Sequence, residues 1–325
     1  MKPTSALLYA SVAVVAGILG LGPLAFPQWG GLALLSFLSL HLSALVGAAA
    51  IVFLVLRQVP LTAALSVLAA ILLMRPILTA GTASTVRIET ATTLVWLNAQ
   101  HKRGAVEQTL ALAKDQQADI AAFAEMPVNW EQRFKTQLAD YQCQEQRTDR
   151  NGERIVILSR QPCLDQGGHP VLGGRETVRW VDLGGGLRVV ALHAPRPFHA
   201  ENLAKWQQPW SQSDVLRRNT TIAEAGNLAA DAREGIVIGD FNSEPWSPAL
   251  KALRRVGFER VPCGAVWQPT WSTGTAVPGF AIDHAFVRTG RKASCSIGPD
   301  VGSDHLPLIL HVERKSEDAL VAEQR

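Results

Sequence analysis

The chain has 325 residues, a formal net charge of +3 and 47% hydrophobic residues, but these averages combine two very different parts. Residues 1–80 carry three charged side chains, Lys2, Arg57 and Arg75, and no acidic residue, a composition that suits a lipid bilayer. The remaining 28 of the 31 basic residues are matched by all 28 acidic ones. The basic pI therefore comes from the first part, and it is no evidence for nucleic-acid binding by the formally neutral second part.

Three apolar segments follow one another in the first part, each close to the length of about 20 residues that a helix needs to cross the hydrocarbon core. They are Leu7–Phe26, Leu32–Leu56 and Val59–Leu78. The first also fits a cleaved signal peptide, but the two segments behind it favour an uncleaved anchor. We therefore predict that residues 1–80 form a membrane anchor of about three transmembrane helices.

The charges around these segments predict their orientation. Lys2 and Arg57 flank the ends assigned to the cytoplasm, and the loop 27–31 carries no charge, as the positive-inside rule requires. The chain is then a multi-pass protein of the inner (cell) membrane whose second part lies on the periplasmic, extracytoplasmic side. Arg75 and Pro76 interrupt the third segment, and if that segment does not cross, the second part is cytoplasmic.

The second part alternates short β-rich runs with loops and helical stretches. The predicted strands are Thr93–Leu97, Ile120–Ala124, Arg154–Leu158, Val178–Leu183, Leu187–Leu192, Ile236–Ile238, Ile282–Val287 and Leu306–Val312, and the predicted helices are Ala105–Ala113, Asp214–Arg233 and Pro248–Val256. Many short strands with few helices predict an α+β fold, a four-layer α/β/β/α sandwich of two stacked mixed sheets covered by helices. We assign this domain to residues 85–312 and a charged, mobile tail to residues 313–325.

Polar residues suited to phosphoryl transfer recur at the ends of these strands. The oxygen donors are Asn98, Glu125, Asp240, Asn242, Asp283 and Asp304, and the imidazoles are His193 and His305. Carboxylate and amide oxygens are ligands that Mg²⁺ prefers, and phosphoryl transfer needs a cation, an acceptor for the proton of water, and donors for the phosphate oxygens. Each residue alone has a simpler explanation, such as a turn-forming Asp or a strand-capping His. Their order and spacing together predict a phosphoester-hydrolysing site.

In this order the motifs resemble the endonuclease/exonuclease/phosphatase superfamily, the fold of pancreatic deoxyribonuclease, apurinic-site endonucleases, neutral sphingomyelinases and inositol polyphosphate phosphatases. The matching motifs are Leu97-Asn98, Ala124-Glu125, Ile157-Leu158-Ser159-Arg160, Ala191-Leu192-His193, Gly239-Asp240-Phe241-Asn242, Ile282-Asp283-His284 and Ser303-Asp304-His305. The resemblance covers residues 92–312 and is closest to bacterial members that carry the domain behind a few membrane spans.

The resemblance implies a metal-dependent site. Glu125 is then the main ligand of Mg²⁺ or Mn²⁺, with Asn98 and Asp304 nearby through oxygen or water. Asp240 orients or deprotonates the attacking water, and Asn242 holds Asp240 in position.

The resemblance also implies roles for the imidazoles. His305, paired with Asp283, contacts the phosphate or acts as the base, and these two roles stay open. His193 donates a hydrogen bond to a phosphate oxygen or to the leaving group.

These observations predict a membrane-anchored hydrolase of phosphoester bonds, similar to phosphodiesterases and nucleases, in which water attacks phosphorus with metal assistance. The substrate is a nucleic acid or a phospholipid headgroup, the N-terminal helices contact the bilayer, and no protein partner is predicted. A catalytically inactive binding or scaffolding module that uses the same site is the alternative. A transporter is disfavoured because the three spans contain no acidic residue.

Four cysteines, Cys143, Cys163, Cys263 and Cys295, lie in the second part, and none has the spacing of a zinc finger. Two interpretations stay open. They form two disulfides if the domain faces an oxidising compartment, or they are four small buried apolar residues.

Overall fold

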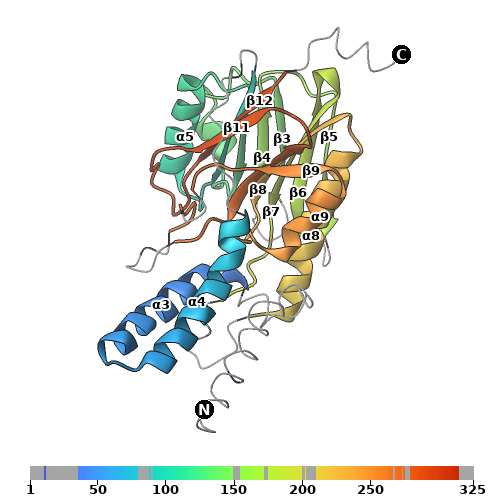
Figure 1. Cartoon of the computed structure of the whole chain (residues 1–325). Helices are drawn as coiled ribbons and strands as arrows, with labels where there is room; N and C mark the ends of the chain where they lie inside the picture. Colours follow the sequence, from blue (N-terminus) through green and yellow to red (C-terminus); the bar gives the residue numbers. More distant parts are fainter. Residues whose placement is uncertain are drawn as a thin grey trace. The chain divides into compact units, whose positions relative to one another are not determined.

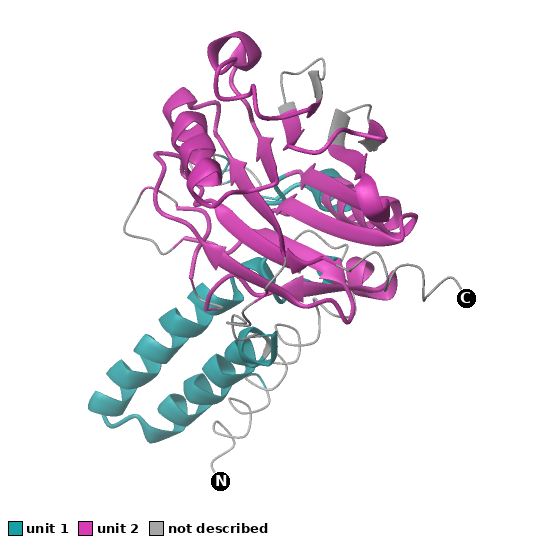
Figure 2. Ribbon diagram, turned by 90° about the horizontal axis from the view of Figure 1, so that it is seen from above, with its two compact units in different colours: residues 1–80, 196–216, 243–250 teal, residues 81–195, 217–242, 251–325 magenta. Residues whose placement is uncertain are grey.

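The computed structural model describes residues 11, 36–79, 88, 91–148, 154–171, 175–199, 202, 210–265, 268–272, 274 and 279–314. Internal contacts divide the chain into two compact units, which Figure 2 colours separately. Unit 1 consists of residues 1–80, 196–216 and 243–250, and unit 2 consists of residues 81–195, 217–242 and 251–325. Unit 1 thus combines the predicted anchor with two segments that interrupt the predicted catalytic domain.

Unit 2 is built on two six-stranded sheets. The first sheet has the order β11 (Ala293–Ile297), β12 (Leu308–Glu313), β1 (Ala91–Asn98), β2 (Ile120–Ala124), β4 (Arg154–Ser159) and β3 (Cys143–Thr148). The second has the order β5 (Asp165–Val171), β6 (Arg175–Leu183), β7 (Leu187–His193), β8 (Glu234–Asp240), β10 (Asp283–Arg288) and β9 (Phe258–Val261). In each sheet one central pair is parallel, β1 with β2 and β7 with β8, and the other pairs are antiparallel. The predicted pair of stacked mixed sheets is confirmed.

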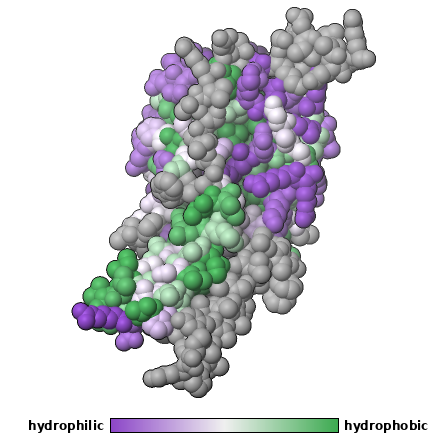
Figure 3. Space-filling view, viewed as in Figure 1, coloured by the Kyte–Doolittle hydropathy of each residue, from purple (hydrophilic) through white to green (hydrophobic). Residues whose placement is uncertain are grey.

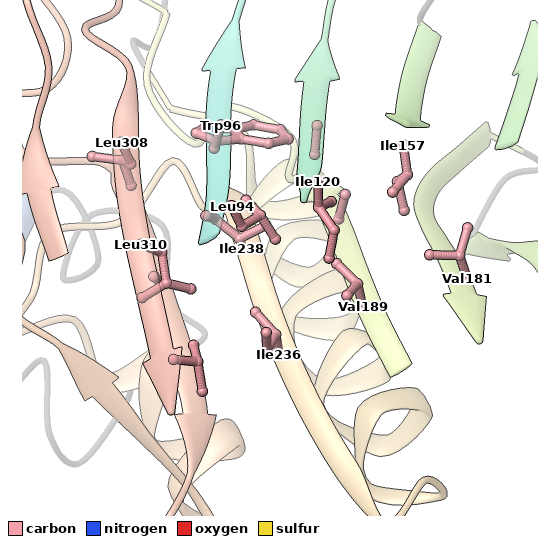
Figure 4. Close-up of a cluster of buried hydrophobic side chains, with 14 of the residues drawn as sticks. Leu94, Trp96, Ile120, Ile157, Val181, Val189, Ile236, Ile238, Leu308 and Leu310 are labelled. Carbon is pink, nitrogen blue, oxygen red and sulfur yellow. The ribbon is translucent and has the colours of Figure 1, made fainter. Parts of the chain in front are cut away.

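Alternating side chains of the central strands explain why the sheets stack face to face. On β1, Leu94 and Trp96 point into the space between the sheets, whereas Val95 and Leu97 point to the opposite face. All four side chains are completely buried. The inner cluster draws residues from both sheets, and Figure 4 shows side chains of both sheets meeting there. The two sheets therefore share one hydrophobic core.

Helices cover the outer faces of the sandwich. Helix α5 (Arg103–Asp115) packs Val106, Leu110 and Ala113 against the outer side chains of the first sheet. Figure 1 shows α8 (Gln212–Ala230) and α9 (Lys251–Arg255) beside the second sheet. Shorter elements are α6 (Trp130–Arg133), η1 (Gly184–Gly186) and η2 (Pro248–Leu250). This arrangement confirms the predicted α+β sandwich.

Unit 1 contains two apolar helices, α3 (Ser39–Val55) and α4 (Val59–Thr79), that pack against each other. Among the described residues, α4 is the helix long and apolar enough to cross a membrane, by length and composition alone, and α3 is shorter at 17 residues. Helix α4 continues through Pro76, so this proline does not end it. Figure 3 shows hydrophobic residues along this pair of helices. Of the predicted first span, Leu7–Phe26, Ser11 alone lies within the described residues.

Four strands that the sequence pattern did not predict, β3, β5, β9 and β11, form the four edges of the two sheets. The cysteines lie on or beside these edge strands. Disulfides join Cys143 of β3 to Cys163, two residues before β5, and Cys263, two residues after β9, to Cys295 of β11. Each disulfide therefore links an edge of one sheet to the facing edge of the other. The interpretation as four unpaired cysteines is wrong.

The strand before the candidate site is tightly packed at Gly239. An added Cβ at this position would overlap the main-chain oxygen of Leu192 on the neighbouring strand, whereas an added Cβ at Gly104 in α5 meets nothing within 4 Å. We expect Gly239→Ala to lower the free energy of unfolding by about 1–3 kcal/mol through overpacking. Gly104→Ala should leave it unchanged or raise it by up to about 1 kcal/mol. Thermal unfolding measures both, and equal stabilities of the two variants would contradict this account.

Candidate active site

The predicted site residues converge at one edge of the sandwich because of strand direction. Parallel strands end at the same edge, and strands antiparallel to them begin there. Asn98 ends β1, Glu125 follows β2, His193 ends β7, Asp240 ends β8, Asp283 begins β10, and Asp304 and His305 precede β12. The fold thus collects residues separated by more than 200 positions in the sequence.

Asp240 occupies the centre of a short row across the second sheet. Its partner on β7 is His193 and its partner on β10 is Asp283, both in direct register. These three side chains therefore lie on three adjacent strands whose spacing is fixed by main-chain hydrogen bonds.

The carboxylate of Asp240 is buried, with 2% of the residue exposed, and polar groups from both sheets approach it. The amide Nδ2 of Asn98 donates to Oδ2 at 3.2 Å. The Nε2 atoms of His193 and His305 lie 3.6 and 3.7 Å from the same oxygen. Oδ2 of Asp240 is therefore the point at which the amide and both imidazoles meet.

Asp283 is buried and accepts hydrogen bonds from three segments. Nε1 of Trp96 donates to Oδ1 at 2.9 Å, while Oγ1 of Thr270 donates to Oδ2 at 2.7 Å. Nδ1 of His305 lies 2.8 Å from Oδ2. Because Nδ1 is engaged with Asp283, the other ring nitrogen of His305 is directed towards Asp240.

Glu125 lies next to Asp240 and shares partners with it. Asn98 Nδ2 donates to Oε1 of Glu125 at 3.2 Å, and Nε2 of His193 is 3.6 Å from that oxygen. His101, which is not among the predicted site residues, places Nε2 3.7 Å from Oε2. The carboxylate of Glu125 therefore belongs to the same polar cluster as Asp240.

Asp304 is held by residues outside the predicted set. Nε2 of Gln100 donates to Oδ2 at 2.9 Å, and Nε1 of Trp271 donates to the same oxygen at 3.0 Å. The hydroxyl of Ser303 donates to the main-chain oxygen of Asn98 at 2.7 Å, which attaches this segment to the end of β1. Gln100 and Trp271 thus fix the orientation of the Asp304 carboxylate.

Backbone strain is concentrated around the site. Of the seven non-glycine residues with positive φ in the described chain, four lie here: Gln100, His101, Glu125 and Asn242, with φ between 44° and 55°. The turn at Asn242 is held by its amide N–H, which donates to Oδ1 of Asp240 at 2.9 Å, and by its Nδ2, which donates to the oxygen of Ala194 at 2.8 Å. Strained conformations of this kind persist where the surroundings over-determine them, commonly at functional sites.

Burial and neighbouring charges shift the pKa values of the acidic groups in different directions. Burial, with the negative charge of Asp283, raises the pKa of Asp240 to about 6. Burial alone would also raise the pKa of Asp283, but His305 and the donors around it hold that pKa below its usual value. Burial likewise opposes ionisation of Glu125, yet His193 and Asn98 keep its pKa below the usual value. Of these three carboxyl groups, Asp240 is thus the one whose pKa is raised towards neutral pH.

His305 has a strongly raised pKa. Burial works against the charged ring, but the contact with Asp283 dominates, and Asp240 and Asp304 add to it, so the pKa rises to about 9. At neutral pH this ring is therefore cationic and a hydrogen-bond donor.

The arrangement fits a divalent cation. Asp240, Asp283 and His305 each offer one ligand atom within 4.8 Å of the others. Both oxygens of Asp283 already accept hydrogen bonds, so Asp240 is the carboxylate of this group with more freedom to contact a cation. The excess of buried negative charge that raises the pKa of Asp240 would be relieved by a cation beside it. The predicted metal ligands Asn98, Glu125 and Asp304 stay a prediction.

Sequence patterns found the charged groups of the site but missed their partners. Trp96, Thr270, Gln100 and Trp271 are absent from the predicted set of site residues. Trp96 had one usable signal, because it lies two residues before Asn98 on β1 and therefore on the same face of that strand.

The chain belongs to the Endonuclease/Exonuclease/phosphatase family, whose sequence model matches residues 95–305. The family membership agrees with the observed fold and supports a hydrolase of phosphoester bonds. No curated protein sequence matches the chain.

Solved structures share the fold at low sequence identity. A 3′-5′ exonuclease from Neisseria meningitidis is 15% identical, with a TM-score of 0.55, and the match covers 68% of this chain and all of that one. A 3′ phosphatase from Neisseria bound to a product DNA hairpin is 14% identical, with a TM-score of 0.55, over 70% of this chain and all of that one. An AP endonuclease from Archaeoglobus fulgidus is 14% identical, with a TM-score of 0.50, over 67% of this chain and 98% of that one.

The raised pKa of His305 predicts how stability depends on pH in metal-free protein. The folded state binds this proton more tightly than the unfolded state, whose pKa is 6.5, so the stabilisation is complete below pH 6.5 and is lost as the pH rises through about 9. We expect the melting temperature in EDTA to fall across this interval. His305→Asn should remove most of the fall, and an undiminished fall in that variant would contradict the assignment.

Proposed function

We propose that this protein is a membrane-anchored, divalent-metal-dependent hydrolase of phosphoester bonds. The observation that carries the proposal is the cluster at the strand ends, where buried Asp240 has a pKa of about 6 and faces the cationic ring of His305. A carboxylate that titrates near neutral pH can take a proton from water, and a buried imidazolium can stabilise a phosphate oxygen.

The residues of the chain divide the work of the reaction. Asp240 orients the attacking water through Oδ2 and accepts its proton. Asn242 holds the other oxygen of Asp240 through its main-chain N–H. His305 donates from Nε2 to a phosphate oxygen while Asp283 fixes its Nδ1. His193, whose Nε2 faces both Asp240 and Glu125, donates to a phosphate oxygen or to the leaving group.

A divalent cation such as Mg²⁺ or Mn²⁺, held by Glu125 with Asn98 and Asp304, supplies neutralisation of the phosphate charge when bound. Oδ2 of Asp304 accepts hydrogen bonds from Gln100 and Trp271, and Oδ1 accepts a longer one from Ser303, so Oδ1 is the less engaged of its two oxygens. Asn98 would contribute its side-chain oxygen, which in this structure accepts a hydrogen bond from the main-chain N–H of Gln100.

The catalytic domain is placed on the extracytoplasmic side of the cell membrane by this proposal. The two disulfides support that side, since disulfides persist in oxidising compartments and are rare in the cytosol. The charge distribution of the anchor, with Lys2 and Arg57 at the ends assigned to the cytoplasm, supports the same side.

Metal-dependent turnover tests the proposed chemistry. The purified chain should hydrolyse bis-p-nitrophenyl phosphate with Mg²⁺ or Mn²⁺ and lose this activity in EDTA. Asp240→Asn and Glu125→Gln should each lower kcat by about 10²- to 10⁴-fold, because they remove a proton acceptor or a metal ligand. Glu107→Gln, at an exposed position of α5, is the matched control and should keep the wild-type rate. Wild-type rates in both site variants would refute the assignment.

Thiol labelling tests the disulfides and the side of the membrane. In whole cells without reductant we expect none of the four cysteines to react with a maleimide, and all four to react after reduction and unfolding. A reporter enzyme that works only outside the cytoplasm should be active when it is fused to the C-terminus of the chain. Free thiols in the isolated native protein, together with a reporter active only in the cytoplasm, would overturn the extracytoplasmic placement.

A further inference from the structure

His101 is an imidazole beside the candidate site that the proposed reaction does not use. It lies in the turn after β1, three positions beyond Asn98, and its main-chain N–H donates to the main-chain oxygen of Glu125 at 2.7 Å. Strands β1 and β2 are parallel and pair Asn98 with Ala124, so the turns that follow them leave the sheet side by side. The backbone therefore holds His101 next to Glu125.

Both residues have a left-handed backbone conformation, with φ of 55° at His101 and 49° at Glu125. This conformation is unfavourable for residues other than glycine, asparagine and aspartate. A further hydrogen bond closes the turn, from the main-chain N–H of Lys102 to the oxygen of Ala99 at 2.8 Å. The fold thus keeps an unfavourable conformation at two residues whose side chains meet, with Nε2 of His101 3.7 Å from Oε2 of Glu125.

The second ring nitrogen of His101 indicates which nitrogen carries the hydrogen. Nδ1 lies 3.4 Å from the main-chain oxygen of Met126, and a carbonyl oxygen can only accept a hydrogen bond. Nδ1 is therefore the donor, and in the neutral ring Nε2 then has a free lone pair. Histidines that bind metals commonly show this arrangement, in which Nδ1 donates to a main-chain oxygen and Nε2 binds the ion.

The distance between His101 and Glu125 suits two ligands of one cation better than a hydrogen bond. Nitrogen and oxygen joined by a hydrogen bond lie about 2.7–3.2 Å apart, and the observed distance is 3.7 Å. Two ligand atoms that each lie about 2.1 Å from an ion are about 3.0–3.6 Å apart at angles of roughly 90–120°. Nε2 of His101 and Oε2 of Glu125 are close to that range.

The two oxygens of Glu125 face different sides of the site. Oε1 accepts a hydrogen bond from Asn98 and lies 3.6 Å from Nε2 of His193, which is the side of Asp240. Oε2 faces His101. The exposed fraction of the side chain rises from 13% at His193 to 23% at Glu125 and 53% at His101. Oε2 is therefore on the open side, where an ion can keep the water molecules that complete its coordination.

We propose that Nε2 of His101 is a ligand of the cation held by Glu125 and makes the site select a transition-metal ion such as Mn²⁺ over Mg²⁺. This inference rests on the proposed function, in which Glu125, Asn98 and Asp304 supply oxygen atoms alone. Mg²⁺ favours oxygen ligands and water, whereas imidazole nitrogen suits transition-metal ions. Among the proposed ligands, His101 is thus the residue that distinguishes the two ions.

A simple ion pair between protonated His101 and Glu125 is the competing explanation, and it predicts the opposite effect. A positive ring beside the carboxylate would repel a divalent cation, so its removal would strengthen metal binding. Removal of a ligand weakens metal binding instead. The sign of the change in affinity therefore distinguishes the two explanations.

Calorimetric titration of the full chain in detergent, with Mn²⁺ alone and with Mg²⁺ alone, measures this change. The test variant is His101→Asn, because asparagine tolerates the left-handed conformation at this position. We expect the Kd for Mn²⁺ to rise about tenfold and the Kd for Mg²⁺ to change by less than about twofold. His169→Asn is the matched control, since Nε2 of His169 on β5 lies 3.9 Å from Oε2 of Glu224 on α8. It should change neither Kd.

Pulsed electron paramagnetic resonance of the Mn²⁺-loaded protein reads the ligand directly. Coupling of Mn²⁺ to an imidazole nitrogen should be present in the wild type and in His169→Asn, and lost in His101→Asn. Unchanged coupling in His101→Asn, or a Kd for Mn²⁺ that is unchanged or lower, overturns the role of His101 and leaves the proposed function intact. Absence of Mn²⁺ binding by the wild type, together with no metal-dependent hydrolysis of bis-p-nitrophenyl phosphate, overturns the proposed function itself.

Discussion

Moving a carboxylate from water into a protein interior costs several kcal/mol of solvation free energy unless hydrogen-bond donors surround it. Asp283 meets this requirement with donors from three segments: Trp96 on the first sheet, Thr270 in the loop before β10, and His305 before β12. All three must be in place at once for the buried charge to be stable. This requirement fixes the two sheets relative to each other at the site edge, and it holds His305 cationic with Nε2 towards Asp240.

The central strands of both sheets could be predicted from the sequence, and the edge strands could not. Strands β1, β2 and β8 are buried on both faces, so their sequences are apolar runs that stand out from the loops around them. Strand β3 reads CQEQRT and β5 reads DQGGHPV, because one side of an edge strand meets solvent and tolerates polar residues. The cysteines beside these strands were visible, but their pairing depends on which edges face each other.

The charged residues of the site could be predicted from the sequence, and their hydrogen-bond partners could not. Asp240, Asp283 and His305 lie in motifs that are continuous in the sequence, and strand direction brings the motifs together. Their hydrogen-bond partners come from the opposite sheet or from irregular loops. The pairing of Trp96 with Asp283, across 187 positions, follows only once the sheets are stacked. The same stacking sets the pKa values, because burial is the first influence on each of these groups.

The row formed by His193, Asp240 and Asp283 has a consequence for how such proteins diversify. These side chains are spaced by the hydrogen-bond lattice of the second sheet, at about 4.8 Å per strand, and not by the loops that follow them. Insertions, deletions or exchanges in those loops beyond Asn242 therefore leave the spacing of these three side chains unchanged. A lineage with this sheet can remodel the outer parts of its loops, and with them its substrate or its cellular location, while these three side chains keep their spacing.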